Sequence, residues 1–280
     1  MSALPGHHAR HTRPVSPAAT LVEALGPIRS EPATSAVLLD IDGTLAPIVR
    51  HAQDAHVPEA TRAVLIEVSR RYGVVGCVSG RRATTARAIV AIGTIAYIGN
   101  HGGELLRPGS TTVEVDPELA AWTDRVREFA ARADTAENQR VRVRCEDKGA
   151  IAAFHWRGAP DEEAAEAAVR MIAERAVQEG FEAHWGRKVL EVRPPVEFDK
   201  GLGVAALVRG EDVSAALYVG DDSTDLDAFR GLRELVATGE LETALCVAVE
   251  SDEAPPELAR EADLTVDGPG GVRALLGALL

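Results

Sequence analysis

In the stretch LLDIDGTL, residues 38–45, a short apolar run leads directly into a pair of carboxylates. The apolar run that it continues predicts a strand over residues 36–40 that is buried on both faces of a parallel sheet. Asp40 and Asp42 stand where this strand ends, and side chains two apart on a strand point the same way. Two such acids can divide the hydrolysis of a phosphate ester, since one attacks phosphorus while the other moves protons. By itself the pattern is also compatible with a polar turn after a strand.

A second group of carboxylates, Asp221, Asp222 and Asp225, follows the apolar strand predicted over residues 216–221. Carboxylates at one strand end repel each other by roughly 4 kcal/mol per pair at about 4 Å and an effective dielectric of about 20. Helix capping explains one of these acids but not all three. A bound cation would relieve the repulsion, and ligands that are all oxygen select a hard ion, with Mg²⁺ the default.

Two further polar residues are predicted at the same edge of the sheet. Ser79 ends the predicted strand of residues 74–79, and the Gly80-Arg81 that follows leads towards a helix, a junction suited to phosphate. Lys200 begins another helix and can neutralise phosphate oxygens as a point charge. Either residue alone would more often be an ordinary turn or a solvated surface charge. Their interpretation depends on the position that they share with the two acid clusters.

Short apolar runs alternate with amphipathic stretches on both sides of a central region, which predicts an α/β fold with a parallel, Rossmann-like sheet. The central region instead shows a hairpin, a long helix and two further strands, which is typical of an inserted α+β cap domain. We therefore expect a core over residues 35–103 and 195–280 and a cap over residues 104–194. A disordered or loosely ordered tail is expected over residues 1–34.

The composition excludes several classes of protein. The formal net charge is −13 and no run of Lys or Arg appears, which argues against a nucleic-acid binder. No apolar run approaches the roughly 18 residues of a membrane span, and the first residues do not form a secretory signal. The three cysteines are scattered, which disfavours a disulfide framework or a zinc site and fits a reducing cytoplasm.

Taken in order, four motifs resemble those of the haloacid-dehalogenase superfamily: Asp40-x-Asp42-Gly43-Thr44, Ser79-Gly80-Arg81, Lys200 and Gly220-Asp221-Asp222-x-Thr224-Asp225. More narrowly, the chain resembles the trehalose-6-phosphate phosphatases, through the phrases LLDIDGTLAPI, GNHGGE, EDKGAIAAFHWR, GRKVLEVRPPVEFDKG and VGDDSTDLDAF. The resemblance implies a haloacid-dehalogenase core with an inserted cap, and an Mg²⁺-dependent hydrolysis of trehalose 6-phosphate that is the final step of trehalose biosynthesis. It implies a small-molecule sugar phosphate as substrate and a trehalose-phosphate synthase as a candidate partner. We expect a monomer.

The resemblance also implies a role for individual residues. Asp40 is the expected nucleophile, Asp42 the acid/base, and Ser79 and Lys200 the phosphate-binding pair. Mg²⁺ is expected on Asp40, the backbone carbonyl of Asp42 and Asp221, with its water shell held by Asp222 and Asp225. Sugar contacts are expected from the cap residues Glu146, Arg157, Arg187 or Lys188, and Glu191, together with His101 of the GNHGGE phrase.

Three departures from the family pattern leave the four catalytic motifs untouched. Arg187 stands where the family often has Lys, Trp156 replaces a usual Tyr, and Leu226 replaces an acid that commonly follows Thr-Asp.

Two alternatives stay open. The enzyme could act on another sugar phosphate, as a phosphatase or a phosphosugar mutase, or the chain could be a catalytically silent module that regulates a synthase. Glu146 and Arg157 could likewise form only a cross-strand ion pair.

Overall fold

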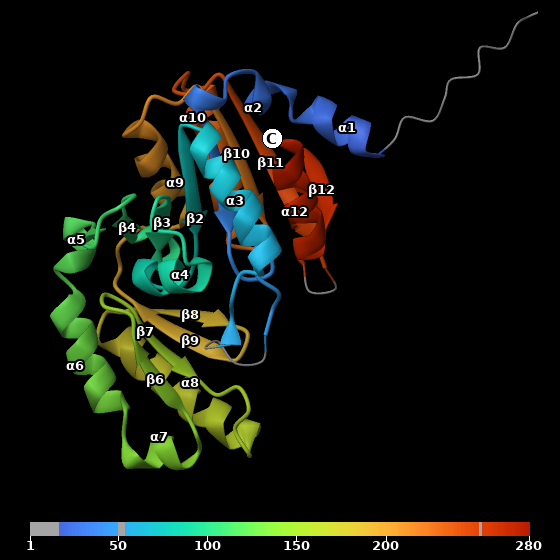
Figure 1. Cartoon of the computed structure of the whole chain (residues 1–280). Helices are drawn as coiled ribbons and strands as arrows, with labels where there is room; N and C mark the ends of the chain where they lie inside the picture. Colours follow the sequence, from blue (N-terminus) through green and yellow to red (C-terminus); the bar gives the residue numbers. More distant parts are fainter. Residues whose placement is uncertain (1–16, 50–53, 252–253) are drawn as a thin grey trace, which may run out of the picture.

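The computed structural model describes residues 17–49, 54–251 and 254–280, which form one sheet of eight strands and one of four (Figure 1). From edge to edge, the larger sheet consists of β12 (Leu264–Asp267), β11 (Thr243–Glu250), β10 (Ala215–Gly220), β1 (Ser35–Asp40), β2 (Val74–Val78), β3 (Ala96–Gly99), β4 (Glu104–Leu106) and β5 (Val113–Val115). The strands from β12 to β3 are parallel, and β4 and β5 add to them in antiparallel fashion. The carboxyl ends of β1, β2 and β10 therefore meet at one edge.

Helices cover both faces of the larger sheet, because the side chains of β1 alternate between two hydrophobic cores. Val37 and Leu39 face one core, and Ala36 and Leu38 face the other. The first core is closed by α3 (Glu59–Arg71), α4 (Ala83–Val90) and α12 (Gly268–Ala278). The second is closed by α9 (Lys200–Arg209), α10 (Asp225–Ala237) and α11 (Pro256–Glu261). This arrangement confirms the predicted α/β fold.

The smaller sheet is antiparallel and has its own hydrophobic core. Its strands, in spatial order, are β6 (Arg144–Asp147), β7 (Ala152–His155), β9 (Val189–Arg193) and β8 (Glu182–Gly186). The helices of this region are α5 (Pro117–Ala120), α6 (Thr123–Ala133), α7 (Ala136–Arg140) and α8 (Glu162–Gln178). Phe154 and Leu190 pack with the apolar residues of α6 and α8, so the helices cover one face of the sheet. Figure 1 shows this unit, drawn in green and yellow, at one end of the larger sheet.

The position of β4 and β5 differs from the expected start of the cap at residue 104. Both strands belong to the larger sheet, where Tyr97 of β3 pairs with Leu106 of β4, and Leu106 with Val113 of β5. Strands of three residues are too short to show a clear alternation in the sequence. The change from one sheet to the other falls after Val115, and the smaller sheet begins at Arg144.

The expected tail over residues 1–34 needs correction where the structure describes it. Residues 17–34 contain α1 (Pro17–Ala24), α2 (Gly26–Ser30) and the 3₁₀ turn η1 (Pro32–Thr34). Leu25 and Ile28 are fully buried in the first core, because this segment packs beside α12 and the central strands. The part of the predicted tail before Pro17 lies outside the described residues. No helix among the described residues has the length and apolar character needed to cross a bilayer.

Candidate active site

Asp40 and Asp221 come together because they terminate neighbouring parallel strands. Leu39 of β1 pairs with Val219 of β10, and each carboxylate follows shortly after its pairing. Asp40 is 5% exposed and Asp221 is 6% exposed. The loop after β1 approaches so closely that a Cβ on Gly43, where φ is +91°, would lie 2.0 Å from Oδ2 of Asp221. The two acid clusters therefore meet at one sheet edge, as their strand-end positions predict.

Lys200 makes a hydrogen bond to one carboxylate of each acid cluster. Its Nζ donates hydrogen bonds to Oδ1 of Asp40 and to Oδ1 of Asp225, both at 2.7 Å. The side chain is fixed because Lys200 opens α9, and Asp199 caps that helix by accepting from the N–H of Leu202. Burial alone would lower the pKa of Lys200, but the charges of Asp225 and Asp40 outweigh it and raise that pKa well above its ordinary value. Lys200 is therefore a permanent buried cation beside Asp40.

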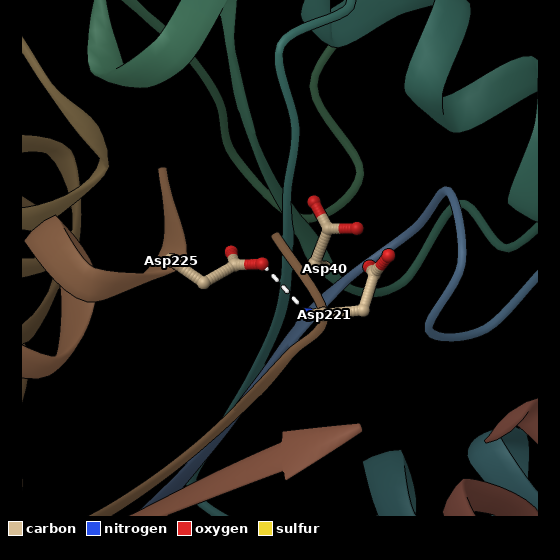
Figure 2. A group of neighbouring side chains, drawn as sticks. All are labelled: Asp40, Asp221 and Asp225. Carbon is tan, nitrogen blue, oxygen red and sulfur yellow. Dashed lines mark hydrogen bonds between the residues drawn. The ribbon is translucent and has the colours of Figure 1, made fainter. Parts of the chain in front are cut away.

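Asp225 organises the loop after β10. Its Oδ1 accepts from Lys200 and from the hydroxyl of Tyr218 at 2.7 Å, and its Oδ2 accepts from the N–H groups of Asp221 and Asp222 at 2.8 and 3.0 Å. Figure 2 shows the bond between Asp225 and the backbone of Asp221 as a dashed line. A Cβ on Gly220 would lie 2.2 Å from Cγ of Asp225, so glycine is required there. Both oxygens of Asp225 are occupied in holding the neighbouring residues in place.

The carboxylates of Asp40 and Asp221 lie in surroundings that disfavour their negative charge. Burial raises the pKa of Asp40 well above its ordinary value, and Asp225 and Asp221 raise it further against the opposing charge of Lys200. Burial, followed by the charges of Asp225 and Asp222, raises the pKa of Asp221 to about 7. A divalent ion among these carboxylates would stabilise their ionised forms and lower both pKa values.

The donor set fits a hard divalent ion. One ligand atom each from Asp40, Asp221 and Asp225 lies within 4.8 Å of the others (Figure 2), and all are carboxylate oxygens. Because Asp225 already has four hydrogen-bond donors, Asp40 and Asp221 have more capacity left for a metal. Asp42 and Asp222 lie outside this group, and the carboxylate of Asp222 accepts from the N–H and hydroxyl of Thr224. Their expected metal roles stay predictions.

Arg81 holds Asp42, a contact that the sequence did not predict. Its Nε donates to Oδ2 of Asp42 at 2.6 Å and its Nη2 donates to Oδ1 at 2.7 Å. Ser79 is 2% exposed at the end of β2, and its Oγ accepts from the N–H of Arg81 at 3.1 Å. Burial alone would lower the pKa of Arg81, but the hydrogen bond and charge of Asp42 raise it. The only indication in the sequence is that Arg81 stands two residues after Ser79.

Lys148 is a second residue that sequence analysis missed, and it links the smaller sheet to the core. Its Nζ donates to the carbonyl of Gly80 at 2.5 Å and to Oε1 of Glu191 at 2.7 Å. Nε2 of His101 lies 3.5 Å from the other Glu191 oxygen, which also accepts from Arg193. Burial alone would raise the pKa of Glu191, but these cationic and hydrogen-bonding partners hold it well below its ordinary value. Lys148 lies two residues after Glu146 in the EDKG phrase, which could have indicated its role.

The other predicted cap residues make contacts within the cap. Oε2 of Glu146 lies 2.9 Å from Nε2 of His155, and this hydrogen bond, followed by the charge of Lys148, lowers the pKa of Glu146. Lys188 donates to Glu162 at the start of α8 at 2.6 Å. Arg157 donates to the carbonyl of Arg187 at 3.1 Å and lines a cavity of about 610 Å³ at the β6 edge of the cap. Glu191 and His101 are thus brought together, whereas Arg157 and Lys188 point to partners in their own domain.

Comparison with known proteins agrees with this geometry. The profile of the family described as Trehalose-phosphatase matches residues 38–265, which include the whole smaller sheet and all of the larger sheet except the start of β1 and the end of β12. "Probable trehalose-phosphate phosphatase G" of Arabidopsis thaliana is 30% identical over 222 residues, covering 71% of this chain and 59% of the relative. An uncharacterized glycosyl hydrolase of Mycobacterium tuberculosis is 32% identical over 209 residues, covering 71% of this chain and 15% of the relative. The chain therefore spans less than two thirds of the length of these relatives.

Solved structures show the same fold. The C-terminal domain of a trehalose-6-phosphate phosphatase of C. albicans has a TM-score of 0.72 at 22% identity, with 95% of this chain and 98% of that chain covered. A trehalose-6-phosphate phosphatase related protein has a TM-score of 0.67 at 21% identity, with 86% and 95% covered. At this identity the similarity concerns the fold alone. Because the family profile spans most of the sequence, the chain belongs to the trehalose-phosphatase family.

Proposed function

We propose that this chain is an Mg²⁺-dependent phosphatase that hydrolyses trehalose 6-phosphate to trehalose and phosphate through an aspartyl-phosphate intermediate. Family membership supports the reaction class. The observation that carries the proposal is the buried carboxylate of Asp40, which lies beside the cation of Lys200 and faces Asp221 at the carboxyl edge of the sheet. Such an edge is where α/β sheets place their ligands.

The chemistry follows from two carboxylates with different surroundings. Asp40 attacks the phosphorus in line, and Asp42 gives a proton to the departing sugar oxygen. In the second step, water attacks the phosphorus of the aspartyl-phosphate while Asp42 takes its proton, which restores Asp40. Bound by Asp40, Asp221 and the backbone carbonyl of Asp42, Mg²⁺ would supply positive charge against the phosphate and the acids.

Binding of the substrate is divided between the two domains. Ser79 and Lys200 hold the phosphate, since the Ser79 hydroxyl ends β2 and Lys200 provides a fixed charge in a site of an acidic protein. The sugar hydroxyls bind to the cap, and Glu191 is the best supported of the cap residues because it lies at the boundary with His101 of the core. Glu146, Arg157, and either Arg187 or Lys188 complete the proposed set.

Two alternative functions remain to be separated from this proposal. The first is a phosphatase or mutase for another sugar phosphate, and the second is a silent module that regulates a trehalose-phosphate synthase. The complete set of motif acids favours an active enzyme over a silent one. We propose that the chain acts as a monomer in the cytoplasm, with a synthase as a candidate partner.

The test is phosphate release from a panel of sugar phosphates, with Mg²⁺ and with EDTA. We expect trehalose 6-phosphate to have the highest kcat/KM and EDTA to abolish turnover. A higher kcat/KM for glucose 6-phosphate would contradict the proposed substrate. Transfer of phosphate between positions of one sugar would indicate a mutase, and no release from any substrate would indicate a silent module. Size-exclusion chromatography with a candidate synthase then tests the partner.

A further inference from the structure

Arg81 approaches Asp42 in a geometry that fixes the orientation of the carboxylate. Nε and Nη2 lie on the same edge of the guanidinium and donate to the two different oxygens of Asp42, at 2.6 and 2.7 Å. Such a paired contact restrains the plane of the carboxylate as well as its distance, which a single ammonium donor does not. About a third of the Asp42 side chain is still exposed (36%), so the contact leaves the carboxylate accessible.

The segment that carries Arg81 is itself held from two sides. Within the core, the N–H of Arg81 donates to the hydroxyl of Ser79 at 3.1 Å. From the cap, Lys148 donates to the carbonyl of Gly80 at 2.5 Å. Lys148 is 5% exposed and is also paired with Glu191, so it is a buried contact of fixed geometry. The backbone that carries Arg81 is therefore held by the core and the cap together.

The contact suits one of the two steps in which Asp42 takes part. In the second step, the oxygen of water forms a bond to phosphorus, the bond between phosphorus and the Asp40 oxygen breaks, and the water proton goes to Asp42. This step needs Asp42 as a proton acceptor, and the two N–H donors of Arg81 fix the orientation of its two acceptor oxygens. Its remaining lone pairs are free to receive the proton. The first step needs no proton from Asp42 when the leaving group departs readily as an anion.

We propose that Arg81 is a positioning residue that orients Asp42 as the general base for hydrolysis of the aspartyl-phosphate. This inference rests on the proposed function, because it assumes the two-step reaction. It goes further by assigning Arg81, which is neither a metal ligand nor a phosphate ligand in that proposal, to the second step. The interaction with Lys148 makes the position of the cap part of the same arrangement.

Stopped-flow measurement with p-nitrophenyl phosphate and Mg²⁺ separates the two steps. Its leaving group absorbs light and departs without a proton, so the first turnover reports the attack by Asp40. For Arg81→Met we expect a burst of p-nitrophenolate approaching one equivalent per active site, at a rate within about threefold of the wild type, followed by steady turnover on the order of 10²-fold slower. Asp42→Asn should show a similar burst. Arg81→Lys, which keeps the charge but loses the paired donors, should show an intermediate steady rate.

Arg82→Met is the matched control, because Arg82 lies next in the same segment but pairs with Glu104 at 3.4 Å instead of Asp42. It should show the wild-type ratio of first turnover to steady turnover. The inference is overturned if Arg81→Met slows both phases equally or slows neither, with Arg81→Lys deciding the matter should the Met variant fail to fold by circular dichroism. If the wild type releases phosphate from neither trehalose 6-phosphate nor p-nitrophenyl phosphate, the proposed function and this inference fail together. A wild type that turns over, combined with no burst in Arg81→Met, overturns the inference alone.

Discussion

In the core, Asp40 and Lys200 are almost completely buried and bind each other, whereas in the cap the ion pair of Lys188 and Glu162 leaves 41% and 42% of the two side chains exposed. The core contacts join three different elements, β1, the loop after β10 and α9, and each carboxylate there has a fixed partner. The contacts of Glu146, Arg157 and Lys188 instead join neighbours within the cap. On the proposed function, the residues that react with phosphate are held in place before substrate binds, while the proposed sugar contacts still have to form.

The largest expected effect lies in the core. Asp40→Asn removes the nucleophile but keeps the shape of the side chain, so turnover of trehalose 6-phosphate should fall on the order of 10⁴-fold or more. The fold should persist, because an amide can still accept from Lys200. Phosphate release and a thermal melt measure the two effects. Substantial turnover in this variant would refute the assignment of Asp40.

Loss of the buried cation should destabilise the core strongly. Lys200→Met leaves the carboxylates of Asp40 and Asp225 buried beside each other without their shared partner. In EDTA we expect the free energy of unfolding to fall by about 3–5 kcal/mol, as for other broken buried ion pairs. Urea denaturation monitors this change, with Arg230→Met as the control, because Arg230 pairs with Asp227 on an exposed helix face. A loss as small as that of the control would show that the core pair contributes no more than a surface pair.

The boundary between core and cap should give a smaller effect that depends on the substrate. Lys148→Met removes a charged hydrogen bond to the Gly80 carbonyl and a partner of Glu191, a loss of about 1.5–3 kcal/mol, or about 10- to 150-fold in kcat/KM for trehalose 6-phosphate. Arg170→Met, which removes an exposed ion pair with Glu166 on α8 and lies outside the proposed sugar-binding set, should change kcat/KM by less than about fivefold. Equal losses in the two variants would remove the distinction between a fixed boundary and an adjustable cap.

The smallest expected effect is on the pH dependence of stability. Burial lowers the pKa of His101 below its usual 6.5, although Glu191 opposes the shift. Between the two values the unfolded chain binds a proton that the folded chain does not, so His101 contributes stability above about pH 6.5 that is lost as the pH falls. Glu191, whose pKa is also lowered, adds a loss of the same sign below its usual 4.5.

We therefore expect His101→Gln to flatten the fall in melting temperature between pH 7.5 and pH 5. The groups that face His101 include Glu191, Lys148, Arg193 and Asp222. Melting curves across this range, with exposed His184→Gln as the matched control, provide the measurement. An unchanged pH dependence in His101→Gln would show that the buried imidazole does not titrate with unfolding.

The sequence predicted that the two acid clusters meet at one edge of the sheet, because the ends of neighbouring strands determine that position. Asp40, Ser79 and Asp221 each follow an apolar strand of a parallel sheet, and the register of neighbouring strands brings such positions together without further information. The contacts of Arg81 and Lys148 could not be predicted in this way. The paired hydrogen bonds from Arg81 to Asp42 depend on the path of the loop after β2. Lys148 reaches the carbonyl of Gly80 only when the cap is packed on the core.

The same dependence on long-range contacts explains where the observed fold differs from the predicted one. The strands β4 and β5 have three residues each, too few for a periodic pattern, and they join the larger sheet only through their pairing with β3. Leu25 and Ile28 follow a run rich in Pro, Ala and Thr. The core in which they are buried is formed partly by α12, which is far away in the sequence. Long-range packing determines these elements, so their local sequence was a weak indicator.

Titration with Mg²⁺ by isothermal calorimetry reports whether Asp40 and Asp221 form one divalent-cation site. We predict that the wild type binds one Mg²⁺ per chain and that Asp221→Asn loses this binding while keeping its melting temperature within a few degrees in EDTA. Asp124→Asn, an exposed acid at the start of α6, should bind as the wild type does. Equal Mg²⁺ affinity in the wild type and in Asp221→Asn would contradict the account.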